Sequence, residues 1–225
     1  MTAAGRRATV ASPDATPPVI HRHGFPSAEG TRENTREGTR EGTREGTREG
    51  TREGTRAAEA PFDAGAAVLH AWATGDAITR YLVGQLDDAV WAAPPPGGKG
   101  RNIAAIAAHL HNVRVMWLKA ADRENAPPAP LDRQAVTRAD ALAALAASHL
   151  ALRRVLAEAL AAGGRVRGFK PDVVGFLGYL LSHEAHHRGQ MTMLARQLGH
   201  PIPQAAMFGM WEWGSRGRGV TAGTG

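Results

Sequence analysis

The sequence contains no cysteine among its 225 residues. This absence excludes disulfide bonds, thiolate metal ligands and cysteine nucleophiles. Any tightly bound metal ion must therefore be held by histidine, aspartate, glutamate or backbone oxygen atoms.

Long apolar runs and dense basic patches are also absent. No stretch of about 18 consecutive apolar residues occurs, so we expect no transmembrane helix and no membrane partner. No apolar segment of the secretory type follows the basic residues near the N-terminus, and we expect a cytoplasmic protein. The net charge of +6 is spread thinly, with no run of five basic residues, so specific nucleic-acid binding is not expected.

A four-residue repeat dominates the N-terminal quarter of the chain. Residues 31–56 read TREN, then repeated TREG, then TR. This period presents no apolar stripe, and glycine at every fourth position weakens any helix. The preceding 30 residues contain four prolines. We therefore predict that residues 1–56 are a disordered low-complexity arm.

Residues 57–225 are predicted to form a helical domain. Apolar residues recur at steps of three and four over residues 62–88, 101–122, 137–163 and 172–198, and segments rich in proline or glycine separate these stretches. Thr137 and Asp140 form a capping-box pattern at the start of the third stretch. No segment shows the alternation of a strand. The fold class predicted is all-α, a four-helix bundle with antiparallel neighbours.

The segment SHEAHHRGQM, residues 182–191, concentrates three histidines on the last predicted helix. Residues four apart on a helix differ by about 40° in rotation, so His183 and His187 share a face and could bind one ion. His186 is a geometric rival of His187 as the second ligand. Imidazole suits several metals, so the spacing alone does not identify one.

A third ligand is expected from another helix. His109 follows the apolar face set by Ile103 and Ile106, whereas His111 lies about 200° around the helix. We therefore expect only one of these two histidines to face the core, and we favour His109. The alternative is that these are ordinary helix histidines.

His183, Glu184 and His187 also match H-E-x-x-H, the signature of zinc proteases. The extended form of that signature requires glycine and histidine at positions where this chain has Gln190 and Met193. Glu212 is the remaining candidate for a downstream acidic ligand, and no sheet edge is predicted to bind a peptide. A protease is therefore the less favoured alternative.

Three sequence features resemble the DinB/YfiT-like family of metalloenzymes. The first is NIAAIAAH at residues 102–109, with Trp117 eight residues further on. The second is HEAHHRGQ at residues 183–190, and the third is GHPIP at residues 199–203 followed by FGMWEW. The resemblance covers about residues 57–215, and the HRGQ segment is its most specific part.

The resemblance implies a four-helix bundle with a metal site of His109, His183 and His187 at one end of its core. It implies a homodimer and a divalent ion such as zinc, nickel or iron. Characterised relatives include S-transferases and isomerases that use low-molecular-weight thiols. We therefore expect a metal-dependent transferase or hydrolase acting on a small molecule, with such a thiol as a candidate cofactor. The alternative is a non-enzymatic bundle that binds metal and dimerises.

Other residues near these histidines are candidates for supporting roles. Glu184 is the candidate catalytic residue, as a base or as an orienter of a ligand. Gln190 is a candidate hydrogen-bond partner of a histidine. Arg188 is expected to be a solvated helix residue, with pairing to a substrate anion as the alternative. Trp211 and Trp213 are expected to pack across the bundle end, with the lining of a pocket over the ion as the alternative.

Overall fold

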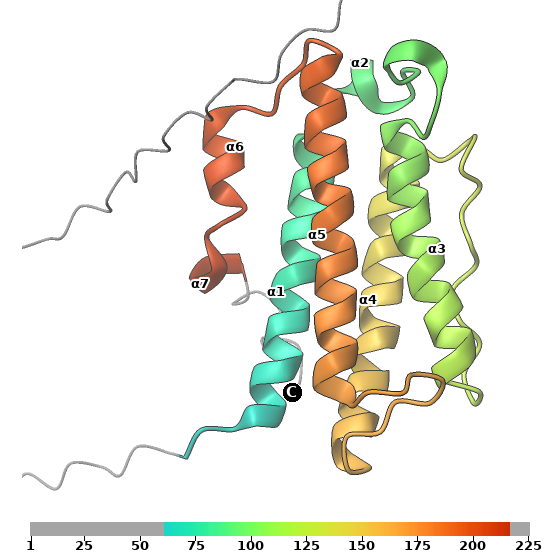
Figure 1. Cartoon of the computed structure of the whole chain (residues 1–225), viewed down its shortest axis with the longest axis vertical. Helices are drawn as coiled ribbons and strands as arrows, with labels where there is room; N and C mark the ends of the chain where they lie inside the picture. The colour runs from blue at the N-terminus through green and yellow to red at the C-terminus, as the bar shows by residue number, and fades with distance from the viewer. Residues whose placement is uncertain (1–60, 217–225) are drawn as a thin grey trace, which may run out of the picture. The chain divides into compact units, whose positions relative to one another are not determined.

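Four long helices form the core of the fold, as the sequence predicts (Figure 1). The computed structural model describes residues 61–216, so the predicted disordered arm at residues 1–56 lies outside the described residues. The long helices are α1 (Ala64–Gln85), α3 (Ile103–Ala121), α4 (Arg138–Ala161) and α5 (Val173–Gln197). The short ones are α2 (Asp88–Trp91), η1 (Pro96–Gly98), α6 (Gln204–Gly209) and α7 (Trp213–Arg216). No strand occurs within residues 61–216, and the all-α prediction is confirmed.

Local sequence signals fix where the helices begin. Asn102 caps α3 by accepting a hydrogen bond from the Ala105 backbone N–H at 2.8 Å. The predicted capping box is present at α4, where the Thr137 and Asp140 side chains each accept from the other's backbone N–H. Each cap satisfies amide groups that have no partner within the helix.

The helix directions differ from the antiparallel arrangement that the sequence suggests. α3 and α4 pack against each other and run in the same direction, as do α1 and α5 (Figure 1). The proline-rich segment 122–137 makes this possible, because it returns along the whole bundle before α4 begins (Figure 1). Because an extended chain covers about 3.3 Å per residue, more than twice the rise of a helix, this short segment can span the length of a long helix.

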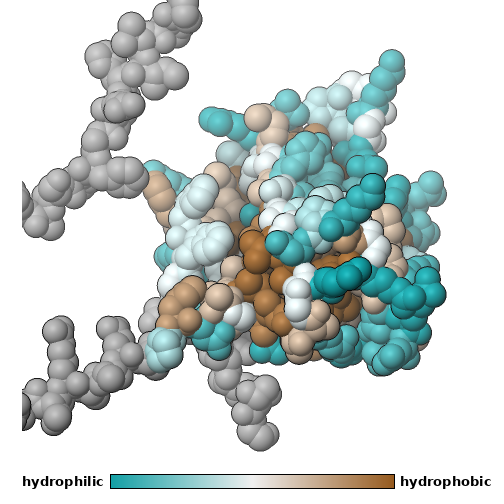
Figure 2. All heavy atoms as spheres, turned by 60° about the horizontal axis from the view of Figure 1, so that its bottom comes forward, coloured by the Kyte–Doolittle hydropathy of each residue, from teal (hydrophilic) through white to brown (hydrophobic). Residues whose placement is uncertain are grey.

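The bundle core consists of two apolar clusters. The upper cluster in Figure 1 includes Leu82, Ile103, Leu110, Leu145 and Met191, and the lower one includes Trp72, Leu118, Leu152, Phe176 and Leu180. Further apolar side chains that are only partly buried pack against the lower cluster. Figure 2 brings that end of the molecule forward and shows apolar residues gathered at its centre, with hydrophilic residues around them.

A buried layer of charged and polar side chains separates the two apolar clusters. Each long helix contributes to it: Asp76 and Thr79 from α1, Arg114 from α3, Ser148 and His149 from α4, and Glu184 from α5 are all buried. The guanidinium of Arg114 lies at its centre. It donates to a Glu184 carboxylate oxygen at 2.6 and 2.8 Å and to an Asp76 carboxylate oxygen at 2.8 Å.

The charge of Arg114 is maintained despite its burial. Burial lowers the pKa of the guanidinium, but Glu184 and Asp76 together outweigh this and raise it. The layer therefore joins α1, α3 and α5 through one arginine.

None of the helices within residues 61–216 is long and apolar enough to cross a membrane.

Candidate metal centre

His109 on α3 and the pair His183 and His187 on α5 converge in the structure. One ring nitrogen from each residue can be chosen so that all three lie within 4.8 Å of one another. The ring of His109 lies 5.4 Å from that of His183 and 4.7 Å from that of His187, measured between centroids. The three histidines predicted from sequence are thus brought together by two helices that pack against each other.

The cluster lies halfway along the bundle rather than at one end. His183 and His187 occupy the central turns of α5, at the level of the buried polar layer. His187 is buried, whereas His109 and His183 are partly exposed at the edge between α3 and α5. The expectation of a site at the end of the core is therefore wrong. The reason is that His183 is next to Glu184, which belongs to the central layer.

The geometry of the cluster fits a divalent metal ion. The Nε2 atoms of His183 and His187 lie 3.2 Å apart. Two imidazole ligands of a tetrahedral ion, each about 2.0–2.1 Å from it, would be separated by about 3.3 Å. Nδ1 of His109 is buried and has no hydrogen-bond partner among residues 61–216, which is unfavourable unless another species binds it.

The protonation states of the three histidines also suit metal binding. Burial, with a smaller effect of Arg101, lowers the pKa of His109 to about 4. Burial and the neighbouring His187 lower the pKa of His183, and burial lowers that of His187. The imidazoles are therefore neutral at pH 7, the form in which they coordinate metal ions.

Gln190 sets the tautomer of His187. Its side-chain oxygen lies 2.8 Å from Nδ1 of His187 and accepts a hydrogen bond from it. This bond leaves Nε2 of His187 unprotonated and directed toward His183. Gln190 also donates to Nε2 of His186, which is exposed and lies outside the three-histidine group.

His111 does not face solvent, contrary to the expectation that only one histidine of α3 faces the core. It is fully buried, with Nδ1 3.1 Å from the Ser148 hydroxyl and Nε2 2.9 Å from the Ala129 carbonyl. The crossover segment 122–137 covers this side of α3, so the buried arc of the helix is wider than its apolar pattern suggests.

Glu184 and Arg188 are engaged within the bundle. The Glu184 carboxylate binds Arg114 through one oxygen and accepts from the Thr79 hydroxyl at 2.7 Å through the other. Arg188 donates to the same hydroxyl at 2.9 Å. These contacts favour Glu184 as a residue that positions α5. They also remove support for a protease, which would need a glutamate free to act as a base beside the ion.

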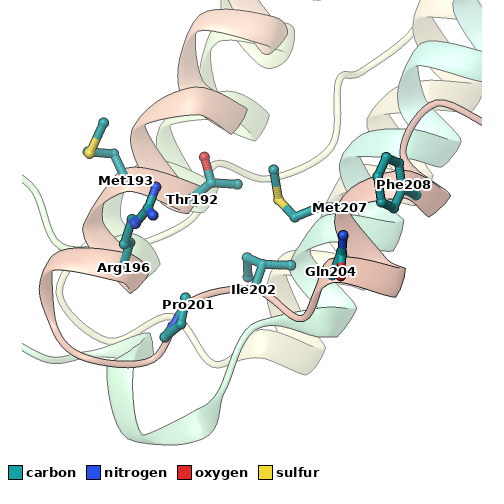
Figure 3. A pocket seen from close by; sticks show the side chains of 8 residues that line it. All are labelled: Thr192, Met193, Arg196, Pro201, Ile202, Gln204, Met207 and Phe208. Carbon is teal, nitrogen blue, oxygen red and sulfur yellow. The ribbon is translucent and has the colours of Figure 1, made fainter. Parts of the chain in front are cut away.

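Two hollows border α5, and one of them lies next to the three-histidine cluster. One of about 770 Å³ adjoins it and is lined in part by Ile106, His186 and Gln190. The other, of about 360 Å³, lies between α5, α6 and the loop joining them (Figure 3). In Figure 3, Met207 and Phe208 belong to α6, and Thr192 and Arg196 belong to α5.

The two tryptophans near the end of the described chain do not line the hollow beside the histidines. Trp211 and Trp213 line a third hollow, together with Arg188 and Met207, where α6 and α7 pack beside α5. The less favoured alternative, that they line a pocket over the ion, does not hold, because α6 lies on the side of α5 facing away from α3 (Figure 1).

Comparison with known proteins identifies the family of the chain. No curated protein and no solved structure matches it. Residues 71–191 match the DinB superfamily. This segment contains all three histidines and spans α1 to most of α5. Because the match covers more than half of the sequence, the chain belongs to the DinB superfamily.

Proposed function

We propose that the protein binds one divalent metal ion through His109, His183 and His187. The observation that carries this proposal is the convergence of three imidazole nitrogens within 4.8 Å. The tautomer of His187 set by Gln190, which leaves Nε2 unprotonated, supports it. Zinc, nickel and iron are the candidate ions, because neutral imidazole suits all three.

The proposed activity is that of a metal-dependent transferase or hydrolase, with a low-molecular-weight thiol as one candidate substrate. Three protein ligands leave a position open, where a bound ion supplies Lewis acidity and favours the deprotonated form of a thiol or water. Gln190 keeps His187 oriented, and the hollow lined by Ile106 and His186 offers room for a second reactant. Glu184 is proposed to position α5 through Arg114.

A thiol alkylation assay tests the proposed activity. Full-length protein loaded with zinc, nickel or iron is mixed with a low-molecular-weight thiol and monobromobimane. In this reaction a sulfur–carbon bond forms, bromide leaves and the thiol proton passes to solvent. We expect the rate of thiol alkylation with metal-loaded protein to exceed the rates with metal-free protein and with His109→Ala by about tenfold or more. Equal rates in all three samples, with metal bound in the first, would contradict the thiol transferase proposal.

A non-enzymatic role is the second candidate. Phe208, Trp211 and Trp213 are 64, 76 and 46% exposed near the end of the described chain. Exposed aromatic residues of this kind are typical of surfaces that bind another protein. In this alternative the bundle binds its ion and self-associates, and the predicted homodimer is its functional form. Metal-loaded dimers without any turnover would favour it.

A further inference from the structure

The hollow beside the histidine cluster is lined by two cationic side chains. It lies between the loop that precedes α3 and the upper part of α5, and has a volume of about 770 Å³. Lys99 and Arg101 line it from the loop, and both are exposed. Its described lining contains no acidic side chain, so neither cation is neutralised by a carboxylate within the hollow.

The backbone of the loop holds these two cations at the same hollow. Gly100, between them, has a φ of 103°, in the left-handed region that side chains other than glycine rarely adopt. The space around it is open, because a Cβ atom added at this position would meet nothing within 4 Å. The glycine is therefore required by the turn of the chain rather than by crowding.

Apolar side chains form another part of the lining, next to the polar His186, Gln190 and Gln197. Ile106 from α3 and Met193 and Leu194 from α5 line the same hollow. A ligand that fills this space must therefore combine an apolar segment with a group that suits a guanidinium and an ammonium. Carboxylates and phosphates meet the second requirement, because arginine binds both with paired, charge-assisted hydrogen bonds.

One residue, Gln190, links the hollow to the histidine cluster. Gln190 lines it and also hydrogen-bonds His187 through its oxygen and His186 through its nitrogen, at 2.8 and 3.0 Å. A molecule held by Arg101 would therefore lie beside the residue that orients His187.

We propose that this hollow binds the anionic end of a small amphiphilic substrate, with Arg101 and Lys99 holding its carboxylate or phosphate. This inference deepens the proposed function, on which it rests, by assigning a substrate class to the same site. Arg101 is a specificity-determining residue, and it takes the role that the sequence suggested for Arg188.

Ligand binding to the metal-free full-length protein tests this proposal without the ion. The probes are hexanoate, hexyl phosphate and the neutral control hexanol, titrated by NMR. We expect saturable binding of at least one anion, weakened about tenfold or more in Arg101→Gln, and much weaker binding of hexanol. Lys119→Gln, which removes an exposed lysine from the last turn of α3, is the matched control and should bind like the parent.

The outcomes separate this proposal from the metal proposal. Hexanoate bound alone identifies a carboxylate site, and hexyl phosphate bound alone identifies a phosphate site. Hexanol bound as tightly as the anions, or Arg101→Gln indistinguishable from Lys119→Gln, would overturn the anion site. Metal content measured on the same samples should be unchanged in Arg101→Gln. Anion binding by a chain that takes up no metal would sink the proposed function and leave this inference standing.

Discussion

Replacing Arg114 by methionine is expected to lower the free energy of unfolding by about 3–5 kcal/mol. The substitution preserves much of the side-chain volume but leaves the carboxylates of Glu184 and Asp76 buried without their shared cation. Removing one partner of a buried ion pair costs far more than removing an exposed one, because the remaining charge cannot reach water. Chemical denaturation of the metal-free protein measures the change.

Arg154→Met is the matched control for this prediction. Arg154 bonds the buried Asp122 at 2.6 Å, but its own side chain is 43% exposed. Asp122 also keeps hydrogen bonds from the backbone N–H groups of Glu124 and Asn125, so the loss of Arg154 should cost only about 1 kcal/mol. Adding Glu184→Gln to Arg114→Met should recover part of the lost stability by removing one uncompensated charge. If Arg114→Met and Arg154→Met lower the free energy of unfolding by the same amount, the buried layer does not hold the helices together through Arg114.

Replacing His187 by alanine is expected to weaken metal binding by roughly a hundredfold or more. His187 supplies a buried imidazole whose Nε2 faces that of His183, and no other side chain of the cluster can take its place. Competition with a chromophoric chelator measures the dissociation constant for zinc in the full-length parent and variant.

His186→Ala provides the control on the same helix turn. His186 is exposed and lies outside the three-histidine group, although its ring packs edge-on against that of His187, with centroids 5.0 Å apart. Its removal should therefore change the dissociation constant by less than about tenfold. A larger loss in His186→Ala than in His187→Ala would assign the ligand role to His186, the rival that sequence spacing alone leaves open.

The helices were predictable because their signals are local. The capping box of Thr137 and Asp140, the apolar steps and the glycine after α5 mark boundaries close to those observed. The parallel direction of α3 and α4 was not predictable in this way. It depends on the path of segment 122–137, and a proline-rich sequence indicates an extended chain without indicating where that chain leads.

Part of the candidate site was predictable for a similar reason. The four-residue spacing of His183 and His187 fixes their common face, and the apolar steps of α3 direct His109 toward α5. The role of Arg114 was missed, although it lies four residues from both Leu110 and Leu118 on the buried face. An arginine in that position is usually exposed, and only the buried Asp76 and Glu184 on other helices explain it.

The most direct test of the central claim is X-ray absorption at the metal edge of the zinc-loaded full-length protein. We expect one zinc ion per chain with three imidazole ligands at about 2.0–2.1 Å and an oxygen ligand in the open position. The His109→Ala protein should lose one imidazole from that spectrum or fail to retain the ion. A parent spectrum with two imidazoles, unchanged in His109→Ala, would contradict a site shared between α3 and α5.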